Sequence, residues 1–471
     1  MDYVLAIDQG THASRAVVFD AQGQIVARQL CPIDLARPQR GRADQDAEQI
    51  ADSVEQAIDA ALQQLGVRQR QAVRCCGIAT QRSTVLAWRR NGAPASAAIN
   101  WQDTRGAPQL APLHSSAEAI RKISGLPLSA HYGATKLHWL HQLTGNDPDI
   151  RLGPLSSFLL ERLTQDGRFA VDHTNAQRMQ LLDIHTLTWS PVLSDWFGVP
   201  IDSLPLCQPV NAAHGTLRDC AVPVTAMAGD QNAAWFASGA PDPAMALVNL
   251  GSGAFVLAAQ QSAAGIPELL SSIVYSDAEG CSFVAEGTVN GAGNALQWLE
   301  SRWHIGDPES RLAAWLEQVQ DPPLFMNSVG GLGSPWWRED LQPAFSDSDK
   351  PYSDAERGAA VAESIVFLLQ HNLERMGGQQ PVRQLRISGG LSRLAPLCQK
   401  LANLTECPVQ RPDDREATAR GIAWLAAGRP EHWQPPGEIQ LFQPAPDPGL
   451  RTRYERFTEE LRHFIERGSR D

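Results

Sequence analysis

One local pattern occurs twice in this sequence, and it restricts the fold more than any other feature. An apolar segment runs into a polar turn with glycine, and a second apolar segment follows at once, over residues 4–19 and again over residues 246–259. Apolar segments joined by so short a turn are typical of paired β-strands. The duplication predicts two similar halves. The pattern breaks at residues 239–243, where two prolines stand beside a glycine.

The first half predicts a mixed sheet with a covering helix. Residues 4–7, 16–19 and 24–27 are expected to be strands, and residues 76–80 and 84–88 are extended as well. Between them, Asp46 and Gln49 form a capping-box signature, and a helical face carries Ile50, Val54 and Ile58. The order of strands and helix is that of an α/β unit.

The second half repeats this order. Strands are expected at residues 246–250, 254–259, 272–275 and 282–285, and helices at 292–303 and 359–376. A further strand at 385–388 runs into Gly389 and Gly390 and a new helix, and the chain closes with an amphipathic helix around residues 454–465. We therefore expect an N-terminal domain of residues 1–239 and a C-terminal domain of residues 240–471.

Composition excludes several classes of protein. The 471 residues carry a net charge of −12, which disfavours nucleic acid as a partner. The longest apolar run, residues 421–428, is too short to span a bilayer, and the first residues do not have the pattern of a signal peptide. The eight cysteines form no C-x-x-C motif, so we expect reduced thiols in the cytoplasm rather than structural zinc.

Glycine turns at strand ends suggest how the chain binds phosphate. The sequence has no phosphate-binding loop of the G-x-x-x-x-G-K-[ST] type. Polar, glycine-bearing turns do follow strands at residues 8–11, 251–253 and 388–390. Backbone N–H groups in such turns can hold phosphate oxygens, although each turn alone is more often only a turn. Together they predict a nucleotide in a cleft between the two domains.

Several side chains near these turns could take part in chemistry. Asp230 follows an apolar run and would reach a strand end, or it could simply cap the next helix. Asp8 could reach a metal ion or close its own turn, and Arg82 suits a polyhydroxylated ligand or a surface ion pair. Trp101 and Phe255 could cover the C–H face of a polyol, although aromatic residues are more often part of a core.

Short motifs carry a resemblance to a known family. The motifs are Asp8-Gln9-Gly10-Thr11 with Ser14-Arg15, Thr80-Gln81-Arg82, Trp101-Gln102-Asp103-Thr104-Arg105, residues 133–139, Thr174-Asn175-Ala176, residues 184–189, Gly229-Asp230-Gln231, residues 331–335 and Gly389-Gly390. In content and order they resemble the FGGY carbohydrate kinases from residue 4 to about residue 430. Among these kinases, they are most similar to the glycerol kinases.

The resemblance implies an α/β fold of two actin-like (ribonuclease-H-like) domains with a ligand cleft between them. It implies transfer of the γ-phosphoryl group of ATP, with Mg²⁺, to a hydroxyl of a small polyol or sugar. Asp230 matches the catalytic base, which would take the proton of the acceptor hydroxyl. Asp8 and Asp230 match the metal-side acids. The residues matching the nucleotide side are Asp8, Gly10, Thr11, His12, Arg15, Ser252, Gly253, Gly293, Gln297, Gly389 and Gly390. Those matching the acceptor side are Arg82, Ser83, Trp101, His131, Gln231 and Phe255.

The sequence departs from the glycerol kinases at the acceptor. Ser83 replaces a glutamate that holds glycerol hydroxyls, and His131 replaces an acceptor-contacting tyrosine. On the nucleotide side, His12, Ser388 and Leu394 replace a threonine, an aspartate and an asparagine. Because a lost carboxylate leaves hydroxyls unpaired, a larger acceptor such as a tetritol or ketose fits better than glycerol.

Other functions remain open at this stage. A true glycerol kinase, a catalytically inert nucleotide-binding sensor and an actin-like or chaperone-like ATPase would share this fold. Asp230 argues against an inert protein, and the acceptor-side residues argue against an enzyme that uses water as its acceptor. The partners expected are the small molecule and ATP or ADP, with a homo-oligomer left open, and neither nucleic acid nor a membrane.

Overall fold

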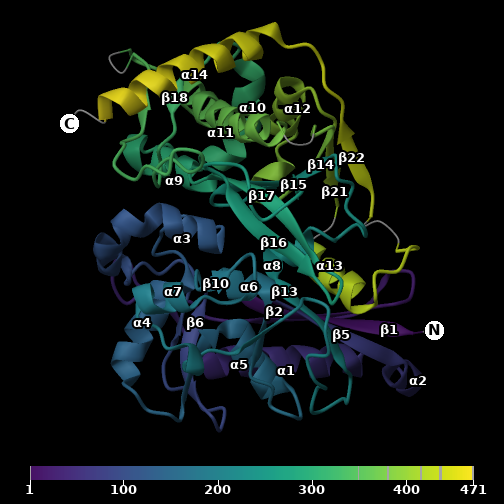
Figure 1. The fold of residues 1–471 in the computed structure, drawn as a ribbon. Coiled ribbons are helices and arrows are strands. Elements are labelled where there is room, and N and C mark those ends of the chain that lie inside the picture. Colours follow the sequence, from purple (N-terminus) through teal and green to yellow (C-terminus); the bar gives the residue numbers. More distant parts are fainter. Residues whose placement is uncertain (1, 348–349, 379–380, 414–415, 434–436, 469–471) are drawn as a thin grey trace.

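The computed structural model describes residues 2–347, 350–378, 381–413, 416–433 and 437–468. These residues form two α/β lobes, one mostly from the first half of the chain and one mostly from the second (Figure 1). None of the described helices is long and apolar enough to cross a membrane. The expected division at residues 239 and 240 stays a prediction.

The first sheet has the strand order β13–β5–β1–β2–β3 in the described chain. Strands β1, β2 and β3 are antiparallel neighbours, while β5 and β13 continue the sheet in parallel with β1. The bounds are β1 (Tyr3–Gln9), β2 (Ala13–Phe19), β3 (Ile25–Pro32), β5 (Val73–Thr80) and β13 (Val224–Gly229). The predicted mixed sheet is therefore confirmed. Every residue of β1 is buried, as expected for a central strand covered on both faces.

The second sheet repeats this plan and adds edge strands. Its order in the described chain is β16–β17–β15–β14–β20–β21–β22, in which β17–β15–β14–β20–β21 has the same directions as β3–β2–β1–β5–β13. The bounds are β14 (Met245–Leu250), β15 (Ala254–Gln260), β16 (Leu270–Ser276), β17 (Cys281–Val289), β20 (Gln384–Ser388), β21 (Val409–Pro412) and β22 (Ile439–Phe442). The predicted internal duplication is confirmed.

Short strands form smaller sheets beside the first lobe and within the second. Strand β6 (Val85–Arg89), which continues the chain after β5, joins β4 (Asp44–Gln45), β7 (Ala98–Ile99) and β8 (Ile150–Pro154) in a separate sheet. Three pairs complete the described strands: β9 (Ala170–Asp172) with β12 (Leu206–Gln208), β10 (Leu182–Asp183) with β11 (Thr188–Trp189), and β18 (Phe325–Met326) with β19 (Ala344–Phe345).

The helices of the first lobe are α1 (Ala47–Gln63), α2 (Val67–Gln71), α3 (Ala117–Ser124), α4 (Gly133–Thr144), α5 (Leu155–Leu163), α6 (His173–Gln177), α7 (Pro191–Phe197) and α8 (Asp230–Ala234). Those of the second half are α9 (Gly293–Trp303), α10 (Pro308–Gln318), α11 (Asp354–Met376), α12 (Ala395–Thr405), α13 (Ala417–Ala426) and α14 (Pro448–Gly468). Short 3₁₀ turns are η1 (Ala107–Ser116), η2 (Ile201–Ser203) and η3 (Gly390–Arg393).

The start of α1 differs from the predicted capping box. The Asp46 carboxylate accepts hydrogen bonds from the backbone N–H groups of Glu48 and Gln49, as expected. The predicted second bond of the capping box, from the backbone N–H of Asp46 to the Gln49 side chain, is wrong. The Gln49 amide instead donates to the Asp34 carboxylate over 2.8 Å and accepts from the Asp34 N–H over 3.0 Å. Asp46 therefore caps the helix alone, while Gln49 binds the segment after β3.

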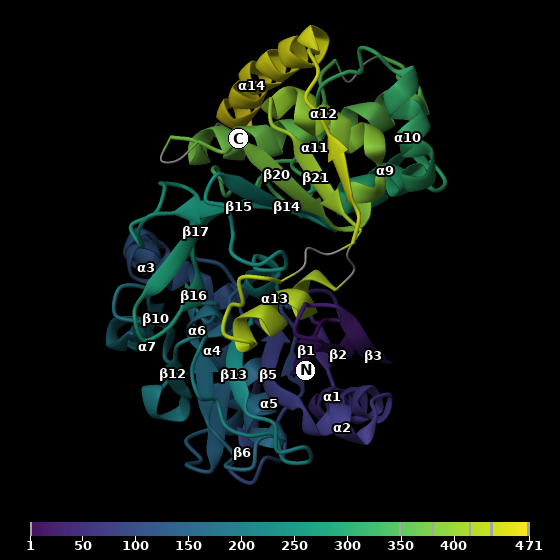
Figure 2. The same ribbon diagram turned by 90° about the vertical axis from the view of Figure 1, so that its right-hand side faces the viewer.

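Helix α13 belongs to the second half of the sequence but packs on the first sheet, as Figure 2 shows. Ile422 and Ala423 lie in one apolar cluster with Val4 and Ala6, on the face of the sheet opposite α1 and α5. The contact with β5 is close, since a Cβ on Gly77 would lie 2.6 Å from the Ile422 carbonyl oxygen, and α13 also touches α8, where a Cβ on Gly421 would lie 1.8 Å from the Ala233 carbonyl oxygen. The chain therefore returns to the first lobe after β21 and then adds the edge strand β22 to the second sheet.

Candidate active site

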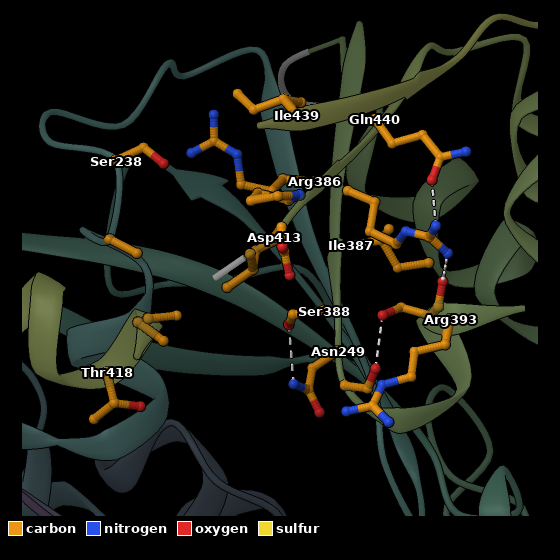
Figure 3. A pocket seen from close by; sticks show the side chains of 18 of the residues that line it. Ser238, Asn249, Arg386, Ile387, Ser388, Arg393, Asp413, Thr418, Ile439 and Gln440 are labelled. Atoms are coloured by element: carbon orange, nitrogen blue, oxygen red, sulfur yellow. Dashed lines mark hydrogen bonds between the residues drawn. The ribbon is translucent and has the colours of Figure 1, made fainter. Parts of the chain in front are cut away.

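A cavity of about 950 Å³ lies between the two lobes. The first lobe contributes Asp8 and Arg15. The second contributes the end of β21 and the end of β20, with Arg386, Ile387 and Ser388 (Figure 3). Thr418, at the start of α13, lines the cavity and donates to the backbone oxygen of Asp230 over 3.4 Å. The predicted residues on its wall are Asp8, Arg15, Gly389 and Gly390.

Asp8 and Arg15 face each other across the hairpin of β1 and β2. Their side chains form an ion pair with 3.1 Å between Nη1 and Oδ2. Burial, reinforced by the negative charge of Asp230, raises the pKa of Asp8 to about 6 in spite of Arg15. Two carboxylates in one cleft thus oppose each other's ionisation, which favours a positive charge between them.

The remaining nucleotide-side candidates lie in or beside the turns of the β1–β2 and β14–β15 hairpins. In the described chain, none of them lines this cavity. The backbone N–H groups of Gly293 and Asn294 donate to the carbonyl oxygens of Gly251 and Ser252, so the start of α9 lies on the Gly251–Gly253 turn. Gln297 is exposed one turn further along α9. In the first hairpin, the backbone N–H of Gly10 donates to the carbonyl oxygen of Ala13, and the side chain of His12 is exposed.

Gly389 is held where only glycine fits. Its φ is +93°, and a Cβ there would lie 2.4 Å from the carbonyl oxygen of Leu250. The glycine therefore brings the end of β20 against the end of β14, beside the second turn. At Gly390, by contrast, a Cβ would meet open space.

The acceptor-side candidates Arg82, Asp230 and Gln231 form one cluster. Asp230 is the first residue of α8, directly after β13, so it starts the helix rather than capping it. The Arg82 Nε lies 3.8 Å from the Asp230 carboxylate, and Arg82 also donates to the side chains of Gln231 and Asn232. Burial raises the pKa of Asp230 even though Arg82 opposes the shift, which makes Asp230 a stronger base.

Two buried charged side chains that the sequence analysis missed, Arg178 and Glu286, hold this cluster in place. The Arg178 guanidinium donates to the Glu286 carboxylate over 2.5 Å, and Arg82 lies 3.6 Å from the same oxygen. Burial alone would oppose the ionisation of Glu286, but the two guanidinium groups lower its pKa to about 2. Arg178 follows the Thr174-Asn175-Ala176 motif closely, so a reader of the sequence could have included it. Glu286 lies within an apolar strand and carries no such signal.

Trp101 and His131 form an aromatic edge of the acceptor side. Their ring centres are 5.7 Å apart, and the Trp101 indole donates to the Thr11 hydroxyl over 2.9 Å. The His131 side chain is exposed at the surface. Desolvation by the surrounding protein, with the cations Lys136 and Arg178 nearby, lowers its pKa to about 3. The imidazole is therefore neutral at physiological pH. Phe255 packs instead against the apolar cluster that contains α13.

Ser83 has an unusual environment. Its φ is +61°, its side chain is buried, and its Oγ makes no hydrogen bond within the described residues. Its carbonyl oxygen accepts from the buried Lys136 Nζ over 2.7 Å, and the same Nζ donates to the His131 carbonyl over 2.9 Å. Lys136 thus joins the two positions at which the acceptor side departs from the glycerol kinases.

In the described part of the chain, no group of three or more histidine, cysteine or carboxylate side chains is placed so that it could hold a metal ion. The eight cysteines all lie in the described ranges and are free thiols, three buried and five half-buried.

Comparison with known proteins agrees with this architecture. The family description "FGGY family of carbohydrate kinases, N-terminal domain" matches residues 3–249, and its C-terminal counterpart matches residues 246–428. A glycerol kinase from Xanthobacter autotrophicus is 33% identical over 92% of this chain and 91% of its own length. One from Trichodesmium erythraeum is 32% identical over 90% and 88%.

Solved structures share the fold over almost the whole chain. Glycerol kinase from Plasmodium falciparum with ADP has a TM-score of 0.86 at 23% identity, covering 99% of this chain and 98% of its own. A xylulose kinase from Brucella ovis has a TM-score of 0.85 at 21% identity, covering 98% of both chains. The expected pair of actin-like domains is confirmed, and an inert sensor is not favoured. The protein is an ATP-dependent phosphotransferase with an alcohol acceptor, and the chain belongs to the FGGY family of carbohydrate kinases.

Proposed function

We propose that this kinase phosphorylates a polyol or sugar with at least four carbons and discriminates against glycerol. Ser83 carries the proposal. A serine hydroxyl is shorter than a glutamate carboxylate and uncharged, so it leaves more space and holds a small ligand less tightly. Because the Ser83 Oγ is buried without a hydrogen-bond partner in the described chain, a hydroxyl of a longer acceptor would satisfy it.

The residues at this site can perform the transfer in one step. Asp230 accepts the proton of the acceptor hydroxyl as that oxygen forms its bond to the γ-phosphorus and the bond to the leaving ADP breaks. Arg82 and Gln231 would orient the acceptor, since both lie against Asp230. His131, neutral at physiological pH, can donate one hydrogen bond and accept another, which suits a hydroxyl.

The carboxylates Asp8 and Asp230 would hold Mg²⁺ together with the ATP phosphates. They fit this ion because carboxylate oxygens are its preferred protein ligands, and because burial and the charge of Asp230 raise the pKa of Asp8 even beside Arg15, so that a further cation would stabilise the ionised carboxylate. When bound, the ion neutralises charge on the phosphates. The glycine turns at Gly10, Ser252–Gly253, Gly293 and Gly389–Gly390, with Thr11, His12, Arg15 and Gln297, are proposed for the nucleotide. The eight free thiols support a cytoplasmic location, and a homo-oligomer is testable by light scattering.

A second candidate function, a plain glycerol kinase, is favoured by the names of the relatives over most of the chain. A panel of glycerol, four-carbon and five-carbon polyols and ketoses separates the two. We expect kcat/KM for at least one longer acceptor to exceed that for glycerol about tenfold. The double variant Ser83→Glu with His131→Tyr should raise kcat/KM for glycerol at least about tenfold, since each hydrogen bond to a charged group contributes ~1.5–3 kcal/mol.

Each single variant serves as a control for the pair, and thermal unfolding establishes that all three fold. If the wild-type protein phosphorylates glycerol better than every longer acceptor, the proposal fails and the protein is a glycerol kinase.

A further inference from the structure

A second cavity, of about 300 Å³, lies in the first lobe outside the cleft. It is lined by Arg37, Gln39, Arg40, Gly41, Arg42 and Gln102. Half of these residues are arginines, and none is acidic. Such a concentration of positive charge is unexpected in a chain whose net charge is −12. The residues come from one loop between β3 and β4 and from the segment that also carries Trp101.

The loop has a defined backbone. Residues Ala36 and Asp44 exchange two backbone hydrogen bonds of 2.9 Å and close it at its base. Gly41 has a φ of +77°, and its carbonyl accepts from the Thr104 N–H over 2.9 Å. The arginine side chains therefore project from a turn that is held against residues 100–104, not from a free segment.

The arginines of this cavity differ from the neighbouring Arg105 in that they have no carboxylate partner in the part of the chain that the structure describes. Arg105, close by, is paired with the carboxylates of Asp44 and Asp103. Arg37 donates to the neutral amide of Gln102, and Arg42 lies 5.9 Å from the centre of the Trp139 ring. Within the described residues, no carboxylate comes within salt-bridge distance of Arg37, Arg40 or Arg42.

We propose that this cavity, defined by Arg37, Arg40 and Arg42, binds a small oxyanion of the phosphate or carboxylate type. The planar guanidinium group offers paired donors that match the oxygens of these anions. An anion would also relieve the repulsion between neighbouring cations, which no carboxylate of the described chain does.

The site has a direct connection to the acceptor side. Gln102 contacts Arg37, and the preceding residue, Trp101, contacts Thr11 and the His131 ring. An anion held by the loop would therefore stabilise the segment that carries Trp101. The anion has two sources: a charged group of the acceptor itself, in which case the inference rests on the proposed function, or a separate ion.

Binding tests the site without reference to turnover. Titration calorimetry with inorganic phosphate and pyrophosphate compares the wild-type protein, the variant Arg40→Gln with Arg42→Gln, and a control, Arg68→Gln with Arg462→Gln. The control removes two exposed arginines outside the cavity and so reproduces the change in net charge. Any phosphate bound in the main cleft is common to all three proteins.

We expect the cavity variant to bind one anion fewer per chain, or to bind it at least about tenfold more weakly, while the control matches the wild type. Equal binding by the variant and the control would overturn the site, whether both resemble the wild type or both are weakened. All three proteins should unfold at similar temperatures.

Kinetics then distinguish the sources. If the cavity variant raises KM for an acidic or phosphorylated acceptor and leaves KM for neutral acceptors unchanged, the anion belongs to the acceptor. If added phosphate changes KM for a neutral acceptor in the wild type but not in the variant, the anion is a separate ion. An absence of all turnover would count against the proposed function and leave the binding result intact.

Discussion

The two hairpins that begin the two sheets have the same backbone plan and different chemistry. Asp8 lies two residues before Gly10, and Asn249 lies two residues before Gly251. Asp8 is opposite Arg15 on the neighbouring strand and pairs with it, whereas Asn249 is opposite Phe255 and donates to Ser388. The first hairpin therefore presents charge to the cleft, and the second presents a neutral turn.

A similar contrast holds between the surroundings of the two hairpins. The first lobe, with Glu286 from the second, contributes ionised side chains around Arg82 and Asp230, and their pKa values depend on one another. The second lobe lines the cavity with arginines such as Arg386 and Arg411, but where the ends of β14 and β20 meet it contributes glycines and backbone carbonyl groups. Substitutions should accordingly act through charge around Asp8 and Asp230 and through shape at the ends of β14 and β20.

The strongest test of the charged lobe is Asp230→Asn, which keeps the shape of the side chain and removes the base. Loss of a general base is typically worth ~10²–10⁴ in rate, so kcat should fall by that factor. The dissociation constant for ATP, measured by calorimetry, should stay within a few-fold of wild type. A variant that keeps more than about a tenth of wild-type kcat would show that another group takes the proton.

Asp8→Asn tests whether the ionised Asp8 carboxylate lowers the free energy of unfolding. Because the pKa of Asp8 is raised to about 6, the folded state binds this proton more tightly than the unfolded state does. The ionised carboxylate therefore lowers the stability of the wild type as pH rises from 4 to 7, by up to about 3 kcal/mol. Urea unfolding at several pH values should show this loss in the wild type and less of it in the variant. Parallel stability curves for the two proteins would contradict the expectation.

Gly389→Ala tests the role of shape at the ends of β14 and β20. At a φ of +93°, and with a Cβ that would lie 2.4 Å from the Leu250 oxygen, alanine must move the end of β20. We expect KM for ATP to rise about tenfold, equivalent to ~1.4 kcal/mol, with the acceptor KM little changed. Gly390→Ala is the matched control, since its Cβ meets open space. Equal effects of the two substitutions would remove the argument from shape.

Lys136→Met should give a smaller effect, confined to the acceptor. Burial lowers the pKa of Lys136 to about 7, and its Nζ holds the carbonyl groups of Ser83 and His131. Without these bonds the positions of Ser83 and His131 are held less firmly, and we expect the acceptor KM to rise about fivefold, equivalent to ~1 kcal/mol in total, with KM for ATP unchanged. Lys400→Met, which removes a lysine paired with Glu363 in the second lobe, should lower the unfolding temperature without changing the acceptor KM. A rise in both KM values would point to general disruption.

The sequence predicted the repeated part of this fold well and the buried charges poorly. The strands at residues 4–7 and 246–250 were recognisable because continuous apolar runs mark strands covered on both faces. Asp230 was recognisable from its motif and its place after a strand. Glu286 was not, because a single charge within an apolar strand gains its meaning only from partners distant in the chain. Lys136 lies in the motif of residues 133–139, but the sequence did not show that its side chain binds the carbonyl groups of Ser83 and His131. Gln49 is a smaller example, since its side-chain amide binds Asp34, which lies 15 residues earlier, rather than the start of its own helix.

Helix α13 has a consequence for the order in which the protein is synthesised. The face of the first sheet that carries Val4 and Ala6 is covered by residues 417–426. During translation that face has no cover from α13 until the ribosome has passed residue 426, long after the strands themselves have emerged. A truncated chain that ends at residue 239 should therefore be poorly soluble alone, and a separate peptide that spans α13 should bind to it.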